Sequence, residues 1–223
     1  MKDTRATAGT PTLFTLTTGP VNCYPEVLSA IGQPVLYDYD PAFLAQYETV
    51  VLKLQTALGV STIPVILQGE PVLGLEAAAH SLIAPGDTVL NLVSGVYGAG
   101  YGEWLRPRAQ AFHEIRVPYD DVIDPAAVAA FLGAHPETAV VAVCHHDTPS
   151  GTINPIAEIG RVVRDHGALF VVDSVSAWAG MAIDIEAAGA DLLVTGPNKC
   201  LGCPPALSIL AVSDRAWAKM EAN

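Results

Sequence analysis

The sequence predicts an α/β domain of three layers, with helices on both faces of a seven-stranded, mostly parallel sheet. Short apolar runs alternate with helical patterns along the chain, which is the arrangement of parallel strands connected by helices. Several of these runs, such as VVAVC at 140–144 and LFVVD at 169–173, are apolar without interruption. Uninterrupted apolar runs are typical of strands that are covered on both faces.

The first clear helix is predicted from Pro41 to Leu58. Asp40 is suited to the N-cap, Pro41 to the first helical position and Gly59 to the C-terminal stop. The apolar residues of this segment recur at helical spacing and would share one face. They are Phe43, Leu44, Tyr47, Val50, Val51, Leu54 and Leu58.

Seven candidate strands follow this helix, and helical patterns separate most of them. The strands are predicted at Pro64–Leu67, Thr88–Leu92, Glu114–Val117, Thr138–Cys144, Ala168–Asp173, Asp191–Thr195 and Ala206–Val212. The helices are predicted at Leu73–Ile83, Gly98–Gln110, Pro125–His135 and Pro155–His166, and a last one begins near Asp214. Asp124 before Pro125, and Asn154 before Pro155, repeat the cap and proline of the first helix.

The composition is that of a compact, acidic protein. Of 223 residues, 51% are hydrophobic and only 15% are charged, which argues against intrinsic disorder. Lys and Arg number 11 and Asp and Glu number 23, so the net charge is 11 − 23 = −12. This charge would repel nucleic acids and anionic membranes, and neither is expected as a partner. We expect residues 1–18 to form an N-terminal tail and residues 19–223 to form one large domain.

The sequence carries no targeting or metal-binding pattern. No apolar run reaches the roughly 18 residues of a membrane span, and the polar start has no apolar core of a signal peptide. Four cysteines are few for a disulfide scaffold, so a reducing, cytoplasmic location is expected. Cys200 and Cys203 have CxxC spacing, but no second pair accompanies them, and no metal site is predicted.

Two charged residues stand where strands of the predicted sheet end, and ligands bind beyond such carboxyl ends. Asp173 either caps the next helix or holds a charged ligand atom, since a half-buried carboxylate needs a cation or hydrogen-bond donors. Lys199, in TGPNKCLG, is either a solvated charge or, when desolvated, a nucleophile toward aldehydes. Together the two fit pyridoxal chemistry, in which an aspartate keeps the ring nitrogen protonated and a lysine forms a Schiff base.

Other strand ends carry further candidates. His145, His146 and Asp147 are adjacent in the sequence, and adjacent residues in a loop rarely bind one metal ion together. We therefore favour a turn that presents Thr148 to a ligand over a metal site. Tyr97 lies among glycines in SGVYGAGYG, where a flat ligand can approach its ring; the alternative is a tyrosine packed under the next helix. These glycines do not form GxGxxG, so a dinucleotide site is not predicted.

The order of these motifs resembles that of the class V aminotransferases, which have the pyridoxal-phosphate fold type I. The motifs are Gly-Pro at 19–20, LEAA at 75–78, HHDTPSGT at 145–152, VVDSVSA at 171–177 and TGPNKCLG at 195–202. The resemblance covers nearly the whole chain from Gly19 onward. It implies a large domain with a seven-stranded mixed sheet, which agrees with the seven strands expected above.

The resemblance also implies roles for individual residues. Lys199 would be the Schiff-base lysine, and Asp173 would pair with the pyridine nitrogen. Tyr97 would stack on one face of the ring while Val175 packs on the other. Thr148 matches the hydroxyl that lies near the phenolic oxygen of the ring.

Other implications concern the rest of the protein. Asn198 stands at a position that is often glutamine, and Tyr37, in LYDYD, is a further candidate with access to the site across a dimer interface. The family forms homodimers or homotetramers and has a smaller C-terminal domain, whose arginines grip the substrate carboxylate. No arginine of this chain matches that role. We therefore expect a C-terminally truncated product that holds the lysine but lacks carboxylate recognition.

The loop before LEAA departs from the family pattern. That loop is typically rich in Ser, Gly, Thr or His and binds the cofactor phosphate, but here Glu70 replaces a hydroxyl, Pro71 removes an amide donor and Val72 offers no polar group. At about 4 Å and an effective dielectric near 20, each pair of like unit charges costs roughly 4 kcal/mol. A neutral hydroxymethyl group can instead donate a hydrogen bond to Glu70. The alternative is that Glu70 is only a carboxylate favoured by the helix macrodipole.

With this departure, the strings YDYDPAF, GEPVLGLEAAA and CHHDTPSGTINPI resemble the family members that convert pyridoxamine and pyruvate into pyridoxal and L-alanine in vitamin B6 degradation. That resemblance implies that the B6 vitamer is a substrate bound at Lys199. Two alternatives stay open. One is an ordinary class V aminotransferase that holds pyridoxal 5′-phosphate and acts on alanine, serine or ureidoglycine with glyoxylate. The other is a non-catalytic scaffold.

Overall fold

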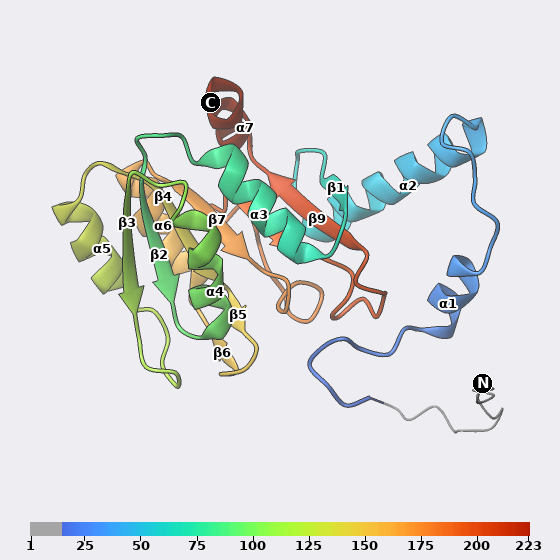
Figure 1. Cartoon of the computed structure of the whole chain (residues 1–223), viewed down its shortest axis with the longest axis horizontal. Helices are drawn as coiled ribbons and strands as arrows, with labels where there is room; N and C mark the ends of the chain where they lie inside the picture. Colours follow the sequence, from blue (N-terminus) through green and yellow to red (C-terminus); the bar gives the residue numbers. More distant parts are fainter. Residues whose placement is uncertain (1–14) are drawn as a thin grey trace, which may run out of the picture.

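The computed structural model describes residues 15–223 and has the predicted three-layer α/β architecture (Figure 1). Most of the expected N-terminal tail at residues 1–18 lies outside the described residues. The middle layer is a seven-stranded sheet in the order β1-β9-β8-β7-β4-β2-β3. In that order the strands are Val65–Gln68, Leu207–Val212, Leu192–Thr195, Leu169–Asp173, Thr138–Cys144, Thr88–Val93 and Ala111–Arg116.

The sheet is mostly parallel, as predicted. Only β9 runs against its neighbours, β1 and β8, and every other pair of adjacent strands is parallel. The carboxyl ends of the parallel strands therefore meet at one edge of the sheet. At that edge Asp173 of β7 lies between Cys144 of β4 and Val194 of β8.

Helices cover both faces of the sheet, and each face has its own core. On one face, α3 (Pro71–Leu82), α4 (Val96–Leu105) and α7 (Asp214–Ala222) pack on the sheet through residues such as Leu75, Tyr101 and Ala216. On the other, α5 (Pro125–Ala134) and α6 (Ile156–His166) contribute Val128, Ile159 and their neighbours. The burial of β4, β7 and β8 on both faces explains why their sequences are mostly apolar without alternation.

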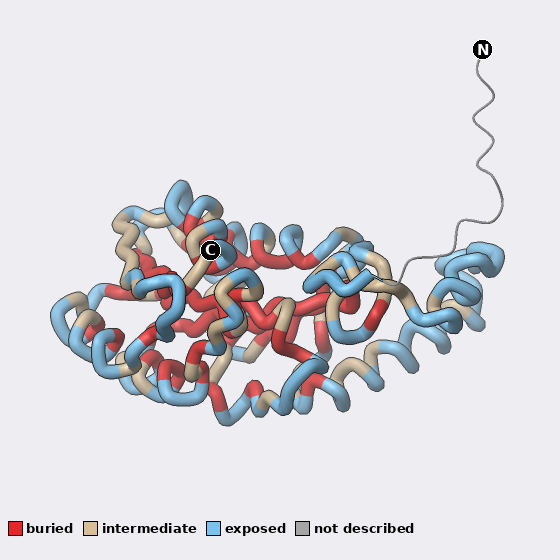
Figure 2. Tube along the Cα trace, turned by 90° about the horizontal axis from the view of Figure 1, so that it is seen from below, coloured by how far each residue is buried: buried red, intermediate tan, exposed pale blue. Residues whose placement is uncertain are grey.

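The first two helices lie apart from this body. α1 (Pro25–Ile31) has no buried residue, and α2 (Pro41–Leu58) buries only Leu58. Figure 2 shows this arm as an exposed extension beside the buried centre of the sheet. Apolar side chains remain uncovered along the arm, with Val35 98% exposed and Tyr39 74% exposed. Among residues 15–223, no helix is long and apolar enough to cross a membrane.

The helix ends test the capping predictions. Asp40 and Asp124 do cap α2 and α5, each accepting a hydrogen bond from the backbone N–H two residues later. The prediction that Asn154 caps the next helix is wrong, because Pro155 is the N-cap of α6. The Asn154 side chain is buried and instead accepts from the Ile123 N–H and donates to Ser94 Oγ and Cys144 O.

The remaining differences are local. The strand predicted at Glu114–Val117 begins three residues earlier, at Ala111, and α3 begins at Pro71 instead of Leu73. The sequence did not predict α1 or the short hairpin of β5 (His146–Asp147) with β6 (Thr152–Ile153). This hairpin follows β4 and folds the HHDTPSGT motif back on itself at the edge where the strands end.

Candidate active site

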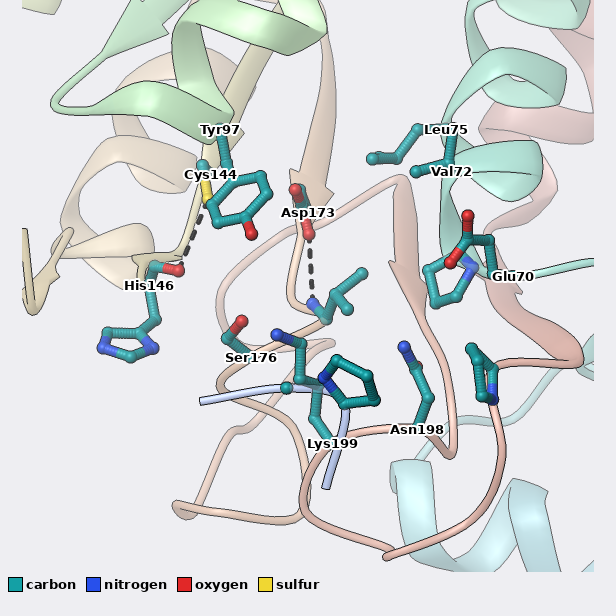
Figure 3. A pocket seen from close by; sticks show the side chains of 15 residues that line it. Glu70, Val72, Leu75, Tyr97, Cys144, His146, Asp173, Ser176, Asn198 and Lys199 are labelled. Carbon is teal, nitrogen blue, oxygen red and sulfur yellow. Dashed lines mark hydrogen bonds between the residues drawn. The ribbon is translucent and has the colours of Figure 1, made fainter. Parts of the chain in front are cut away.

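A cavity of about 290 Å³ opens at the edge where the parallel strands end (Figure 3). Side chains from several distant segments surround it, and six of the eight residues predicted for the site are among them. These six are Glu70, Tyr97, Asp173, Val175, Asn198 and Lys199. The volume is at the lower end of the range for pockets that bind small organic molecules.

Asp173 forms the floor of the cavity because it is the last residue of β7, where the chain leaves the sheet. Its side chain is buried, at 6% exposure, and Oδ1 accepts a hydrogen bond from the Val175 N–H at 3.0 Å. Burial raises the pKa of Asp173 to about 6, although the Val175 N–H and the charge of Lys199 act in the opposite direction. A carboxylate that is this reluctant to ionise favours a cationic partner in the cavity.

Lys199 reaches the cavity from the loop after β8. Its Nζ donates a hydrogen bond to the Thr18 carbonyl oxygen at 2.8 Å, and the side chain is half-buried. The N-terminal segment passes close above it, since a Cβ on Gly19 would lie 2.5 Å from Nζ. Gly19 also has a φ of +144°, so this position suits glycine for two separate reasons. Lys199 and Asp173 thus project into the same space from adjacent strand ends (Figure 3).

Tyr97 forms one wall of the cavity from the first turn of α4. Its ring is 48% exposed and faces the space above Asp173 (Figure 3). The alternative that Tyr97 packs under the next helix is therefore not what is observed; Tyr101, one turn later, is the buried tyrosine of α4, at 2% exposure. A flat ring could enter between Tyr97 and the segment after Asp173, where Val175 also lines the cavity.

Two predicted residues do not line the cavity. Thr148 lies next to it, and its Oγ1 pairs at 2.6 Å with Oγ of Ser176, which does line it. Tyr37 lies between α1 and α2, on the exposed arm, where it is 68% exposed and packs on Tyr39 with 5.6 Å between ring centroids. Tyr37 is therefore not brought to the site within one copy of the chain.

Several lining residues were not predicted. Cys144, His146 and Ser176 line the cavity, as do Pro20 and Pro205. Cys144 could have been found from the strand pattern, because it pairs with Asp173 in the parallel register and ends its own strand. Ser176 and Pro205 belong to loops, and their positions depend on tertiary packing that the sequence pattern does not reveal.

Glu70 lies across the cavity from Tyr97, at the N-cap of α3 (Figure 3). Its carboxylate makes no capping hydrogen bond, and the residue is exposed. Pro71 follows as the first residue of the helix and has no N–H to offer. The N-terminal end of α3 thus presents a negative charge and lacks the N–H of Pro71, which disfavours an anionic group at this end of the cavity.

Asn198 adds an orphan acceptor to the cavity. The side chain is 9% exposed, and its Oδ1 has no hydrogen-bond partner within the part of the chain that the structure describes. Buried polar atoms without a partner are rare in native proteins. A hydrogen-bond donor on a ligand would satisfy this oxygen. In residues 15–223 no group of three or more His, Cys, Asp or Glu side chains is placed to hold a metal ion.

Replacing Asp173 by asparagine should stabilise the fold at alkaline pH. Because the folded pKa is raised from 3.8 to about 6, the wild-type carboxyl contributes stability below pH 4, and this contribution is lost as the pH rises through 6. Asparagine keeps the acceptor for the Val175 N–H but never ionises. We expect Asp173→Asn to be more stable by up to about 3 kcal/mol at pH 8, and equally stable at pH 4.

Urea unfolding of both proteins between pH 4 and 8 measures this difference. His145, whose burial lowers its pKa to about 4, changes the stability of both proteins equally and cancels. Asp165→Asn, an exposed carboxylate on α6, is the matched control and should show a difference that does not vary with pH. A stability gain of Asp173→Asn that stays constant from pH 4 to 8 contradicts the prediction.

The family model for aminotransferase class-V matches residues 71–222. Pyridoxamine–pyruvate transaminase of Mesorhizobium japonicum is 62% identical over 211 residues, which are 95% of this chain and 54% of that protein. The chain therefore spans about half the length of the curated relatives it matches.

Solved structures of aminotransferases also match this chain. The crystal structure of pyridoxamine–pyruvate aminotransferase from Mesorhizobium loti matches with a TM-score of 0.92 at 62% identity, covering 95% of this chain and 54% of that one. Ureidoglycine–glyoxylate aminotransferase from Bacillus subtilis also matches with a TM-score of 0.92, at 27% identity, covering 97% and 56%.

Proposed function

The chain belongs to the aminotransferase class-V family, and from that premise we propose that it transfers the amino group of pyridoxamine to pyruvate, giving pyridoxal and L-alanine. The family depends on pyridoxal phosphate. In our proposal the unphosphorylated vitamer takes that place and is a substrate. The chain is half the length of its relatives, so the proposal concerns the reaction to which this half contributes its site.

One observation carries the choice of vitamer, namely the position of Glu70. Its carboxylate lines the cavity at the end of α3, where a phosphate would have to lie. A phosphate within about 4 Å of this carboxylate would be repelled by it, whereas a hydroxymethyl group would donate a hydrogen bond to it. The high identity to a relative named for pyridoxamine and pyruvate supports the same choice.

The residues of this chain have distinct tasks in the proposed reaction. When bound, the pyridoxal ring acts as an electron sink for the carbon that loses a proton. Asp173 holds the proton of the ring nitrogen, and Lys199 moves a proton between the two carbons that exchange the amino group. Tyr97 and Val175 hold the ring from its two faces. Thr148, which pairs with the cavity-lining Ser176, bonds to the phenolic oxygen.

Carboxylate recognition has to come from elsewhere. Lys199 is the only lysine or arginine among the cavity-lining residues that the structure describes, and it is engaged in the proton transfer. We infer that basic residues other than those that line this cavity bind the carboxylate of pyruvate. We also infer a homodimer or homotetramer, because the apolar arm of α1 and α2 needs a cover; a second copy would bring Tyr37 near a site. The cytoplasmic location stays a prediction that rests on the sparse cysteines.

Two alternatives to the proposed reaction stay open. An ordinary class V aminotransferase with bound pyridoxal phosphate is favoured by the close structural match to ureidoglycine–glyoxylate aminotransferase. The other alternative is a non-catalytic scaffold.

Equilibrium binding of pyridoxal and of pyridoxal 5′-phosphate, followed by absorbance in separate titrations of the chain, separates these three functions. We expect pyridoxal to bind more tightly than its phosphate by about tenfold or more, from the repulsion by Glu70. Tighter binding of the phosphate supports the ordinary aminotransferase and overturns our proposal. Failure of both vitamers to bind supports the scaffold.

A further inference from the structure

Asp147 is a buried carboxylate that the reaction outlined above does not use. It lies on β5, is 0% exposed and does not line the cavity. Its Oδ2 accepts a hydrogen bond from the Gly98 N–H at 3.0 Å, but within the described residues its Oδ1 has no partner. A buried carboxylate with a single hydrogen bond is unfavourable for folding, so its presence here needs a reason that lies in the site.

The contact with Gly98 fixes the first turn of α4. Gly95 is the N-cap of this helix and has no side chain to cap it, so Asp147 caps the helix from another segment. The fit is close, because a Cβ on Gly95 would lie 2.4 Å from Cγ of Asp147. Tyr97 is the residue immediately before Gly98. The contact with Asp147 therefore fixes the backbone from which the ring of Tyr97 projects.

Asp147 also holds the turn that carries Thr148. Its carbonyl oxygen accepts from the Gly151 N–H at 2.9 Å and from Ser150 Oγ at 3.0 Å. Thr148 then reaches Ser176 at the cavity wall. One residue therefore connects the wall that Tyr97 forms with the turn beside the cavity.

The charge of Asp147 reaches the floor of the cavity as well. It raises the pKa of Asp173 beyond the effect of burial, and it also contributes to the raised pKa of the Cys144 thiol. The other ionisable groups that act on Asp173 are Tyr101 of α4, Cys144 of β4 and Lys199 of the loop after β8. Tyr97, His146 and Glu70 line the same cavity.

We propose that Asp147 is a positioning residue of this site, which fixes the first turn of α4 that carries Tyr97 and adds a second buried carboxylate near the strand ends where Asp173 lies. The part that concerns the vitamer rests on the proposed function. With a pyridinium nitrogen beside Asp173, the extra charge stabilises the ring proton, which the electron sink requires. An uncharged residue of the same shape would cap α4 but would not stabilise the proton on the ring nitrogen.

Two variants separate position from charge. Asp147→Asn keeps the shape and an acceptor for the Gly98 N–H, whereas Asp147→Ala removes both the cap and the charge. The carboxyl of Asp173 is titrated by carbon-13 NMR in the ligand-free chain, and pyridoxal affinity and the pH at which the bound ring loses its proton are followed by absorbance. Asp165→Asn serves as the exposed control.

We expect Asp147→Asn to fold, to bind pyridoxal within a few-fold of wild type, and to lower the midpoints of Asp173 and of the ring by about half a pH unit or more, as a nearby like charge requires. Asp147→Ala should lower both midpoints and also weaken pyridoxal binding by about tenfold or more. Should Asp147→Ala fail to fold, the lower midpoints in Asp147→Asn still support the role of the charge, and pyridoxal binding by Asp147→Asn that is weaker by about tenfold or more would overturn the separation of charge from position.

Unchanged midpoints in Asp147→Asn overturn the role of the charge, and unchanged pyridoxal affinity in Asp147→Ala overturns the role in positioning. A change in stability alone, with both midpoints and affinity unaltered, would show that Asp147 is purely structural. If the wild-type chain itself does not bind pyridoxal, the proposed function fails, but the titration of Asp173 in the ligand-free chain still decides whether Asp147 acts on it.

Discussion

Replacing Lys199 by alanine should abolish covalent capture of pyridoxal. In the wild-type chain, Nζ is half-buried in a cavity of about 290 Å³ beside Asp173, and its hydrogen bond to the Thr18 carbonyl holds it there. An amine placed in this way attacks the aldehyde carbon, and water leaves. Without the amine no covalent bond to the vitamer can form at this position, so the effect is a complete loss and not a graded one.

Borohydride reduction followed by mass spectrometry measures the capture directly. The wild-type chain should gain one reduced pyridoxal, attached to the peptide that contains Lys199. Lys53→Ala, an exposed lysine of α2, is the matched control and should label like the wild type. Lys199→Arg retains a cation for the Thr18 carbonyl and should fold but remain unlabelled. Labelling of Lys199→Ala at wild-type level would mean that another lysine is the nucleophile.

Capture by itself does not establish turnover. A chain that labels at Lys199 yet does not convert pyridoxamine and pyruvate would be a competent half-site. A chain that does not label at all would favour the scaffold. The covalent test therefore distinguishes a formed site from an inactive fold before any assay of the reaction.

The sheet and the positions of Asp173 and Lys199 could be predicted because they depend on short-range patterns. Continuous apolar runs identify strands that are covered on both faces, and a charged residue directly after such a run has to lie at the edge of the sheet. The parallel register then places Asp173 next to Cys144. The resemblance to a family added the roles of the residues, which burial and spacing alone left open.

What could not be predicted depends on contacts between distant segments. Asparagine is a residue type that often caps helices, so the sequence favours Asn154 as an N-cap. Its side chain is instead buried and forms hydrogen bonds with Ile123, Ser94 and Cys144. The approach of Gly19 to Lys199 joins residues that are 180 positions apart in the sequence. α1 buries nothing within one copy, so no apolar periodicity toward a core marks it.

Replacing Glu70 by glutamine should shift the preference of the site from pyridoxal toward pyridoxal 5′-phosphate. Glutamine keeps the size of the side chain and removes its charge, and Glu70→Ser also restores a hydroxyl at the N-terminus of α3. Glu70 is exposed, so the effective dielectric lies between about 20 and 80, and each pair of like charges at about 4 Å contributes roughly 1–4 kcal/mol. The phosphate carries nearly two charges, so the repulsion sums to roughly 2–8 kcal/mol, and we expect the affinity ratio to change by about thirtyfold or more.

Titrations of the two vitamers at low and high salt test both the size and the origin of this shift. If repulsion by Glu70 sets the preference, salt should weaken the preference of the wild type for pyridoxal and should have much less effect on that of Glu70→Gln, because exposed charges are screened. Glu76→Gln, an exposed carboxylate on the same helix that does not line the cavity, is the matched control and should retain the wild-type ratio. An unchanged ratio in Glu70→Gln would assign Glu70 to the helix macrodipole alone, and the choice of the unphosphorylated vitamer would lose its physical basis.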